Sequence, residues 1–291
     1  MSDSNWGRWG VEDERGAPNL LTPNVVLAAV RAVRTGEVIS LALPLDAGTL
    51  VPRGRRSPEH AMTRDGGDYA TGGKILGRSR FSDDIVILGT HTGTHIDSLA
   101  HVWYDEELYN GFGQESLRSG GARRCGIDKL GPLIGRGVLI DVASHAGVSA
   151  LPSNFAIGKQ LLADACAAGG VELKAGDIVL IRTGWLGLHG SDTGAYFAGE
   201  PGLDLGGACW LATCDVAAIG SDNYAVERLE AGSREGFPVH ELLLRDQGIP
   251  LLEGVVLEEL ANRGVREFLF VAAPLPLSGG TASPVCPIAV L

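Results

Sequence analysis

Residues 137–184 read GVLIDVASHAGVSALPSNFAIGKQLLADACAAGGVELKAGDIVLIRTG, and they predict a strand, a helix and a second strand. The runs GVLIDV (137–142) and DIVLIRTG (177–184) are short, apolar and rich in β-branched residues, which is typical of buried strands. Between them, KQLLADACAAG (159–169) has a helical pattern that stops at a glycine. This stretch therefore indicates a mixed α and β fold.

The same two patterns continue on both sides of this stretch. Further strands are expected in VISLALPL (38–45), IVILG (85–89), VAAIGS (216–221) and FLFVAAPL (268–275). Helices are expected in NVVLAAVRAV (24–33), after the cap Thr22-Pro23, and in PVHELLLRDQG (238–248) and VVLEELANRG (255–264). The alternation places the chain in the α/β class.

The segment 46–82 differs in composition from the rest of the chain. It is rich in Gly, Arg, Ser and Asp and poor in apolar residues, so we expect a long surface loop that serves as a lid or a subunit arm. No internal repeat or low-complexity linker divides the chain. We therefore expect one catalytic domain over residues 1–291, with an N-terminal extension before it.

Composition and charge exclude several classes of protein. The 35 acidic residues against 24 basic ones give a net charge of -11, which disfavours binding to a phosphate backbone. The N-terminal segment is acidic where a signal peptide is basic, and no apolar run approaches the ~20 residues that span a bilayer. Five scattered cysteines without a C-x-x-C pair indicate a reducing compartment. We expect a cytoplasmic protein with no nucleic-acid or membrane partner.

The segment ILGTHTGTHIDSLAHVWYD (87–105) concentrates three of the chain's seven histidines with two aspartates. It is not the helical H-E-x-x-H zinc motif, because threonine replaces the glutamate and the segment follows a strand. In an extended backbone, residues two and four apart share a face, so His91, His95 and Asp97 are expected to converge. Gly93 would lie on the same face and leave room for a metal ion or a close backbone.

Two imidazoles and one carboxylate would leave coordination positions open for water and substrate, as catalytic metal sites require. The competing interpretation is a set of histidines with ordinary hydrogen-bond partners. His101, six residues after His95, is either a further ligand or a nearby acid/base group. Four aromatic residues could form a pocket wall or simply pack in the core: Trp6, Trp9, Trp103 and Tyr104.

Other sequence signals are weaker or absent. Taken singly, His240 at a helix start and Glu253 at a strand end favour ordinary structural roles. There is no G-x-S-x-G, Walker A or G-x-G-x-x-G motif, so the serine-hydrolase, nucleotidase and dinucleotide hypotheses lack support.

The run from His91 to His101, HTGTHIDSLAH, closely resembles the H-x-G-T-H-x-D-x-P-x-H signature of the family named Putative cyclase, which includes bacterial kynurenine formamidases and isatin hydrolase. VHELLLRDQGIPLLEGV (239–255) looks like the second conserved block of that family. DERGAPNLLTP (13–23) and SPVCPIAVL (283–291) resemble its terminal segments. Leu99 stands where proline is usual and Val102 where an aromatic residue is frequent, so the substrate of well-known members does not carry over directly.

The resemblance implies a swivelling β/β/α fold, assembled as a homodimer or homotetramer. It implies that His91, His95 and Asp97 bind a catalytic Zn²⁺ or Mn²⁺ and that His101 is the catalytic histidine. In members with two ions, the matching second set would be Asp97, His240 and Glu253.

The expected reaction is hydrolysis of an amide-type C–N bond in a small aromatic substrate, such as a formamide or a lactam. A metal-dependent cyclase or lyase of secondary metabolism is the first alternative. A catalytically silent small-molecule binding protein is the second, and a protein without bound metal would favour it.

Overall fold

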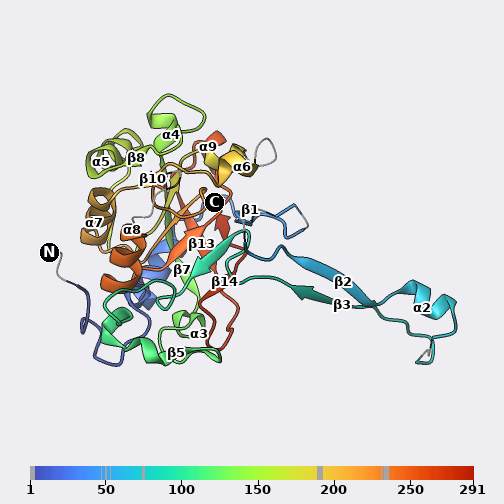
Figure 1. Ribbon diagram of the computed structural model, residues 1–291. Coiled ribbons are helices and arrows are strands. Elements are labelled where there is room, and N and C mark those ends of the chain that lie inside the picture. The colour runs from blue at the N-terminus through green and yellow to red at the C-terminus, as the bar shows by residue number, and fades with distance from the viewer. Residues whose placement is uncertain are drawn as a thin grey trace.

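The structure is a computed structural model that describes residues 4–46, 48–49, 51–52, 54–73, 76–188, 193–230, 232 and 236–291. A nine-stranded sheet runs through the molecule in the order β1-β15-β13-β7-β9-β11-β12-β4-β14 (Figure 1). Its strands are β1 (Val38–Ser40), β4 (His95–Asp97), β7 (Leu133–Asp141), β9 (Ile178–Arg182), β11 (Ala218–Ser221), β12 (Leu251–Glu253), β13 (Glu267–Ala272), β14 (Ala282–Pro284) and β15 (Ile288–Val290). The sheet confirms the mixed α/β class.

The central strands β7, β9, β11 and β12 run parallel, and the strands on both flanks are antiparallel. Parallel strands are buried on both faces, and successive residues alternate between the two faces. In β9, Val179 and Ile181 contribute to one hydrophobic core, whereas Ile178 and Leu180 contribute to the other. This double burial explains why the central strands read as continuous apolar runs.

Helices cover both faces of the sheet. One core contains buried residues of α4 (Val142–His145), α5 (Lys159–Ala168), α7 (Leu205–Thr213) and α8 (Pro238–His240), and the other contains those of α3 (Ile127–Leu130) and α9 (Glu258–Asn262). Helix α1 (Pro23–Val30) lies against β7 and β13. The shorter elements are η1 (Ala17–Leu20), η2 (Tyr109–Gly111), η3 (Gln114–Ser116), β5 (Leu117–Arg118), β6 (Gly121–Ala122), β8 (Ala156–Ile157), η4 (Trp185–Leu188), α6 (Thr193–Tyr196) and β10 (Gly202–Leu203). No helix among the described residues is long and apolar enough to cross a membrane.

The helix expected over 238–248 has a different form. After α8 the chain continues as the π-helical segment η5 (Glu241–Asp246). The backbone N–H of Gln247 donates to the carbonyl of Leu242, five residues earlier, instead of four. A π-turn inserts one extra residue into a helix, and such insertions are frequent at functional sites.

The described residues between 51 and 88 form an arm that projects from the body of the molecule (Figure 1). It consists of β2 (Glu59–Arg64), α2 (Gly66–Ala70) and β3 (Asp83–Ile87), with β2 and β3 paired antiparallel. The described part of the long surface loop expected over 46–82 thus contains part of a two-stranded ribbon and a short helix. The IVILG strand (85–89) is real, but its described residues pair within the arm and not in the central sheet, because its only partner is β2.

Candidate metal centre

The segment that carries His91 and His95 is extended only at its end. Strand β4 begins at His95, and residues 91–94 form bends in which Gly93 has a φ of +61°. A Cβ on Gly93 would lie 3.0 Å from Leu45 Cδ2 and 3.2 Å from Thr49 Cγ2. The expectation that an extended backbone places both histidines on one face is therefore wrong for residues 91–94. The glycine serves a left-handed turn and close packing, and it does not open space for an ion.

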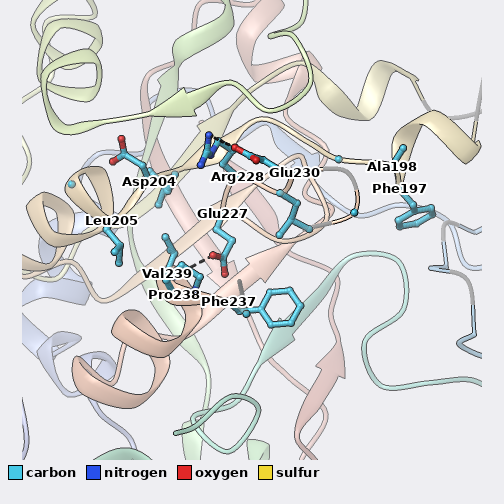
Figure 2. Close-up of a pocket in the computed structure, with 16 residues that line it drawn as sticks. Phe197, Ala198, Asp204, Leu205, Glu227, Arg228, Glu230, Phe237, Pro238 and Val239 are labelled. Carbon is cyan, nitrogen blue, oxygen red and sulfur yellow. Dashed lines mark hydrogen bonds and ion pairs between the residues drawn. The ribbon is translucent and has the colours of Figure 1, made fainter. Parts of the chain in front are cut away.

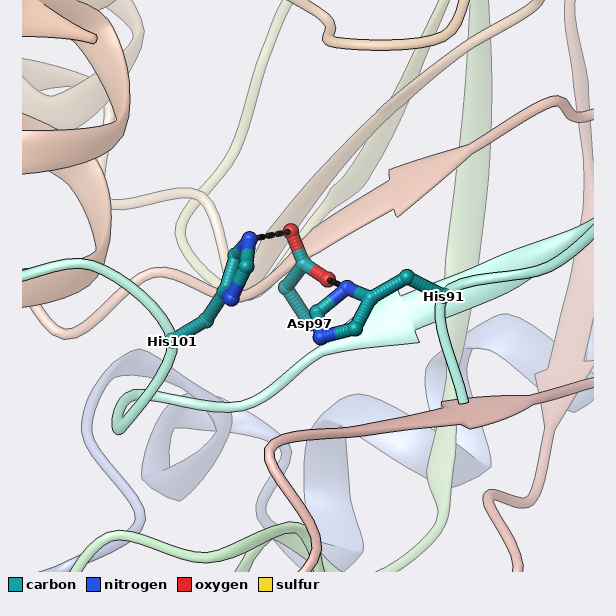
Figure 3. A group of neighbouring side chains, drawn as sticks. All are labelled: His91, Asp97 and His101. Atoms are coloured by element: carbon teal, nitrogen blue, oxygen red, sulfur yellow. Dashed lines mark ion pairs between the residues drawn. The ribbon is translucent and has the colours of Figure 1, made fainter. Parts of the chain in front are cut away.

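Asp97, at the end of β4, is the centre of the cluster. Its Oδ1 lies 2.7 Å from His91 Nδ1 and 3.7 Å from His95 Nε2, and its Oδ2 lies 3.9 Å from His101 Nε2. Figure 3 shows the carboxylate between the His91 and His101 rings, with one oxygen directed toward each. The fold therefore brings together all four residues that the sequence motif singled out.

His240 and Glu253 join this cluster from distant parts of the chain. Strand β12 pairs with β4 so that Glu253 lies opposite His95, and Glu253 Oε2 is 3.1 Å from His95 Nε2. His240, from α8, places its Nε2 3.2 Å from Glu253 Oε1 and 3.9 Å from Asp97 Oδ2. The ordinary structural roles that each residue suggested alone do not describe this arrangement.

The donor atoms suit a divalent cation. In the described part of the chain, two sets of three residues have ligand atoms within 4.8 Å of one another, and the sets are His91, Asp97 and His101, and His95, Asp97 and Glu253. Both sets share Asp97. Among the described residues, neither carboxylate oxygen of Asp97 nor Nε2 of His95 makes a hydrogen bond of good geometry, although all three atoms are buried and the nearest nitrogen and oxygen atoms of the cluster lie 2.7 to 3.1 Å from Asp97 Oδ1 and His95 Nε2. Buried carboxylate and imidazole atoms without partners are costly unless a cation satisfies them.

Two ring nitrogens are fixed by hydrogen bonds outside the cluster. His95 Nδ1 lies 2.9 Å from the carbonyl of Gly93, so it carries the proton and donates, which leaves Nε2 as the free lone pair. His240 Nδ1 makes a short hydrogen bond to the buried Glu227, and its Nε2 faces Glu253. Such outer partners orient metal-binding imidazoles. Sequence reasoning missed Glu227, because nothing in its local pattern distinguishes it from a surface glutamate.

The electrostatics of the cluster are strongly coupled. Burial lowers the pKa of His101 to about 4, against the opposing attraction of Asp97. Burial also acts to lower the pKa of His240, but the hydrogen bonds to Glu227 and Glu253 outweigh it and raise that pKa to about 10. Burial opposes ionisation of Asp97, yet the surrounding histidines hold the pKa of its carboxyl well below the usual range. Asp97 is thus an anion, and His101 is a neutral imidazole beside it.

The threonines between the ligands have structural roles. Thr94 Oγ1 donates to the carbonyl of Gly254 at 2.6 Å and accepts from the backbone N–H of Leu43 at 2.8 Å. These bonds tie the ligand segment to the loop after β12. The hydroxyl of Thr92 is buried without a hydrogen-bond partner in the described structure, and we have no physical account of it.

Different aromatic residues from those expected stand beside the cluster. The Tyr224 ring lies 6.1 Å from the His95 ring, Phe197 meets Tyr224 edge to face, and Phe237 lies 5.5 Å from His240. Of the two roles considered for Trp6, Trp9, Trp103 and Tyr104, the contacts show packing: the Arg245 guanidinium lies over the Trp6 and Tyr104 rings, and Trp9 and Trp103 pack against the core.

A cavity of about 740 Å³ lies beside Glu227 and the start of α8 (Figure 2). Phe197, Glu227 and Phe237 line it, whereas no member of the His/Asp/Glu cluster does so. Since Glu227 binds the ring nitrogen of His240 that faces away from the cluster, the cavity adjoins the outer side of the site. We therefore do not identify it with the position of the reacting bond.

The fold and the cluster together define a mixed α/β protein with a buried His/Asp/Glu centre suited to a divalent metal ion. Residues 39–228 match the family model described as "Putative cyclase", and the chain belongs to this family. Isatin hydrolase of Roseibium aggregatum is 28% identical over 217 residues, which is 72% of this chain and 75% of that protein.

Two solved structures agree with the fold. A crystal structure described as a novel cyclase is 35% identical, with a TM-score of 0.93 and coverage of 100% of both chains. A crystal structure of an isatin hydrolase bound to the product analogue thioisatinate is 23% identical, with a TM-score of 0.67, covering 93% of this chain and 99% of that one. The family named from the sequence motif is thus confirmed.

Proposed function

We propose that this protein is a metal-dependent hydrolase that cleaves an amide-type C–N bond in a small aromatic substrate. The observation that carries the proposal is Asp97, a fully buried carboxylate with nitrogen atoms of three histidines 2.7 to 3.9 Å from its oxygens and, among the described residues, no hydrogen bond of good geometry to either oxygen. The similarity to isatin hydrolase supports the reaction class. We also propose that the fold is of the swivelling β/β/α type, as the family resemblance implies.

The residues fit one or two divalent ions, Zn²⁺ or Mn²⁺. We assign His91, His95 and Asp97 to the first ion, and Asp97, His240 and Glu253 to a second, as the family resemblance implies, so that Asp97 is shared. In the structure the ligand atoms within 4.8 Å of one another group His91 with His101 and His95 with Glu253, and both groups include Asp97. A bound ion would lower the pKa of a water molecule and polarise the carbonyl of the scissile bond. Imidazole and carboxylate ligands suit both metals, so the donor set alone does not select one.

His101 is the acid/base group in this proposal. Its Nε2 lies 3.9 Å from Asp97 Oδ2, and its ring lies 4.0 Å from that of His91, so it borders the proposed first ion. A neutral imidazole there can accept a proton at Nε2 from the attacking water and pass it to the leaving nitrogen. Asp97 holds the compensating negative charge beside it.

Metal content and rate separate the two kinds of residue. The variant His95→Ala should lose bound metal, measured by elemental analysis, together with activity on a panel of formanilides. The variant His101→Ala should keep its metal while the rate falls by about 10²–10⁴, the range of acid/base contributions. Full metal content in His95→Ala would contradict the ligand assignment. Loss of metal from His101→Ala would make His101 a ligand, as its grouping with His91 and Asp97 also allows.

A cyclase or lyase reaction at the same centre is the second candidate, favoured by the family's name. Turnover in ¹⁸O-labelled water distinguishes the two reactions. A hydrolase places one labelled oxygen in the product acid, whereas a cyclisation or elimination places none in the product backbone. If the purified protein contains no metal, and chelators change neither its stability nor its ligand binding, the hypothesis of a catalytically silent binding protein would be favoured instead.

We further propose that the protein works as a homodimer or homotetramer in the cytoplasm, on a small molecule and without nucleic acid or membrane. The arm supports self-association, because a lone two-stranded ribbon is marginally stable and this one exposes Ile85, Val86 and Ile87. Light scattering should give a multiple of the chain mass, and Val86→Lys should reduce it. If the mass is unchanged, the arm does not form the interface.

The proposed cytoplasmic location agrees with the five cysteines, which are free, as in a reducing compartment. Cell fractionation tests this location.

A further inference from the structure

Arg55 connects the base of the arm to the rim of the metal centre. It lies just before β2, and its Nη1 donates to the Tyr224 hydroxyl and, at 3.4 Å, to the carbonyl of His91. The centre of the guanidinium is 5.7 Å from the centroid of the Tyr224 ring. The Arg55 guanidinium therefore joins the two sides of the site, namely the ligand segment at His91 and the loop after β11 at Tyr224.

The charge of Arg55 has no counterion in the described part of the chain. It takes part in no ion pair with a described carboxylate, whereas the neighbouring Arg56 pairs with Glu59 at 2.9 Å. Both described hydrogen bonds of Arg55 come from Nη1 and go to neutral oxygens. A guanidinium has five N–H groups, so those on Nε and Nη2 remain available on an exposed side chain. These two nitrogens form the fork that binds a carboxylate through two parallel hydrogen bonds.

The position of Arg55 sets the geometry of a ligand. Tyr224 separates it from the cluster, with the tyrosine ring 6.1 Å from the His95 ring and the hydroxyl held by Arg55. A molecule that contacts both the proposed ions and the guanidinium would pass beside Tyr224, so its anionic group would be separated from the reacting bond by about the width of that ring. An anilide with a carboxylate on its ring has this shape.

We propose that Arg55 is a specificity residue that binds the carboxylate of a small aromatic amide, and that Tyr224 positions it. The inference rests on the proposed hydrolase function and narrows its substrates to anionic ones. Hydrolysis consumes water and leaves the ring carboxylate unchanged, so Arg55 contributes to substrate binding and not to bond breaking. Its removal should raise KM and leave kcat nearly constant, because an interaction that stabilises the bound substrate and the transition state equally contributes to KM only.

The test compares two probes that differ in one charge, 3-formamidobenzoate and its methyl ester. Arg55→Gln should raise KM for the acid about tenfold to a hundredfold, the range of a hydrogen bond to a charged group, and change KM for the ester less than about twofold. Arg56→Gln, at the adjacent arginine, is the matched control and should leave both values unchanged. Equal changes for acid and ester in Arg55→Gln, or the same loss in Arg56→Gln, would overturn the proposal.

Two further measurements keep the inference separate from the proposed function. Tyr224→Phe retains the ring but removes the hydroxyl, so it should raise KM for the acid by less than Arg55→Gln does and spare the ester. Titration of the metal-loaded protein with 3-aminobenzoate, followed by the fluorescence of that anion, measures binding without turnover. If the wild-type protein hydrolyses neither probe, the hydrolase proposal fails. If Arg55→Gln binds 3-aminobenzoate as tightly as the wild type, the Arg55 proposal fails.

Discussion

Replacement of Glu227 by glutamine should weaken binding of the second metal ion without unfolding the protein. The Glu227 side chain is 2% exposed and accepts hydrogen bonds from His240 Nδ1 and from the backbone N–H groups of Val239 and His240. It thereby keeps a proton on Nδ1 and directs His240 Nε2 toward the cluster, 3.2 Å from Glu253 Oε1, where a metal ion would replace the Nε2 proton. Glutamine has nearly the same shape but retains one acceptor oxygen and carries no charge.

The size of the effect follows from these contacts. Loss of an outer carboxylate that orients a metal-binding histidine typically costs 10- to 100-fold in affinity, which is about 1.4 to 2.8 kcal/mol. Competition with a chromophoric chelator measures this affinity, and circular dichroism establishes that the variant is folded. Glu230→Gln is the control, because Glu230 lines the same cavity but pairs with Arg228 at the surface. Wild-type affinity for every bound ion in Glu227→Gln would refute His240 as a ligand.

Two further predictions concern stability, measured as the free energy of unfolding in denaturant with chelator present. Gly16 has a φ of +70°, and a Cβ there would lie 2.2 Å from the carbonyl oxygen of Gly248, so Gly16→Ala should cost several kcal/mol, about the sum of left-handed strain and overpacking. Gly7→Ala, at φ +73° with nothing within 4 Å, should lose only the strain, and equal losses would contradict the clash. Thr94→Val should lose about 2 to 4 kcal/mol, because it leaves two backbone groups without their partner. Thr94→Ser should be nearly neutral, and a Thr94→Val protein as stable as the wild type would show that these bonds contribute little.

The β-branched runs were sufficient to predict most of the central sheet. Strands form at 133–141, 178–182, 218–221 and 267–272, inside or overlapping the ranges expected from the sequence. The prediction works there because the strands at 178–182 and 218–221 are buried on both faces and the strand at 267–272 buries alternate residues, so the local composition and the tertiary environment agree. The IVILG run (85–89) has the same composition, yet its strand lies in the exposed arm. Local composition therefore predicts that a strand forms, but it does not predict which strand it pairs with.

The sequence by itself determined the family and the ligand segment, since the motif from His91 to His101 is local and its spacing is readable without coordinates. The family resemblance implied that His240 and Glu253 join Asp97, but their own local patterns did not, and the tertiary structure shows that the three meet. Only the tertiary structure shows that Glu227 and Arg55 flank them. The physical reason is that β12 pairs with β4 across more than 150 residues, and the closure of so long a loop depends on the packing of the whole sheet. A pattern that repeats every two or four residues carries no information about such a pairing.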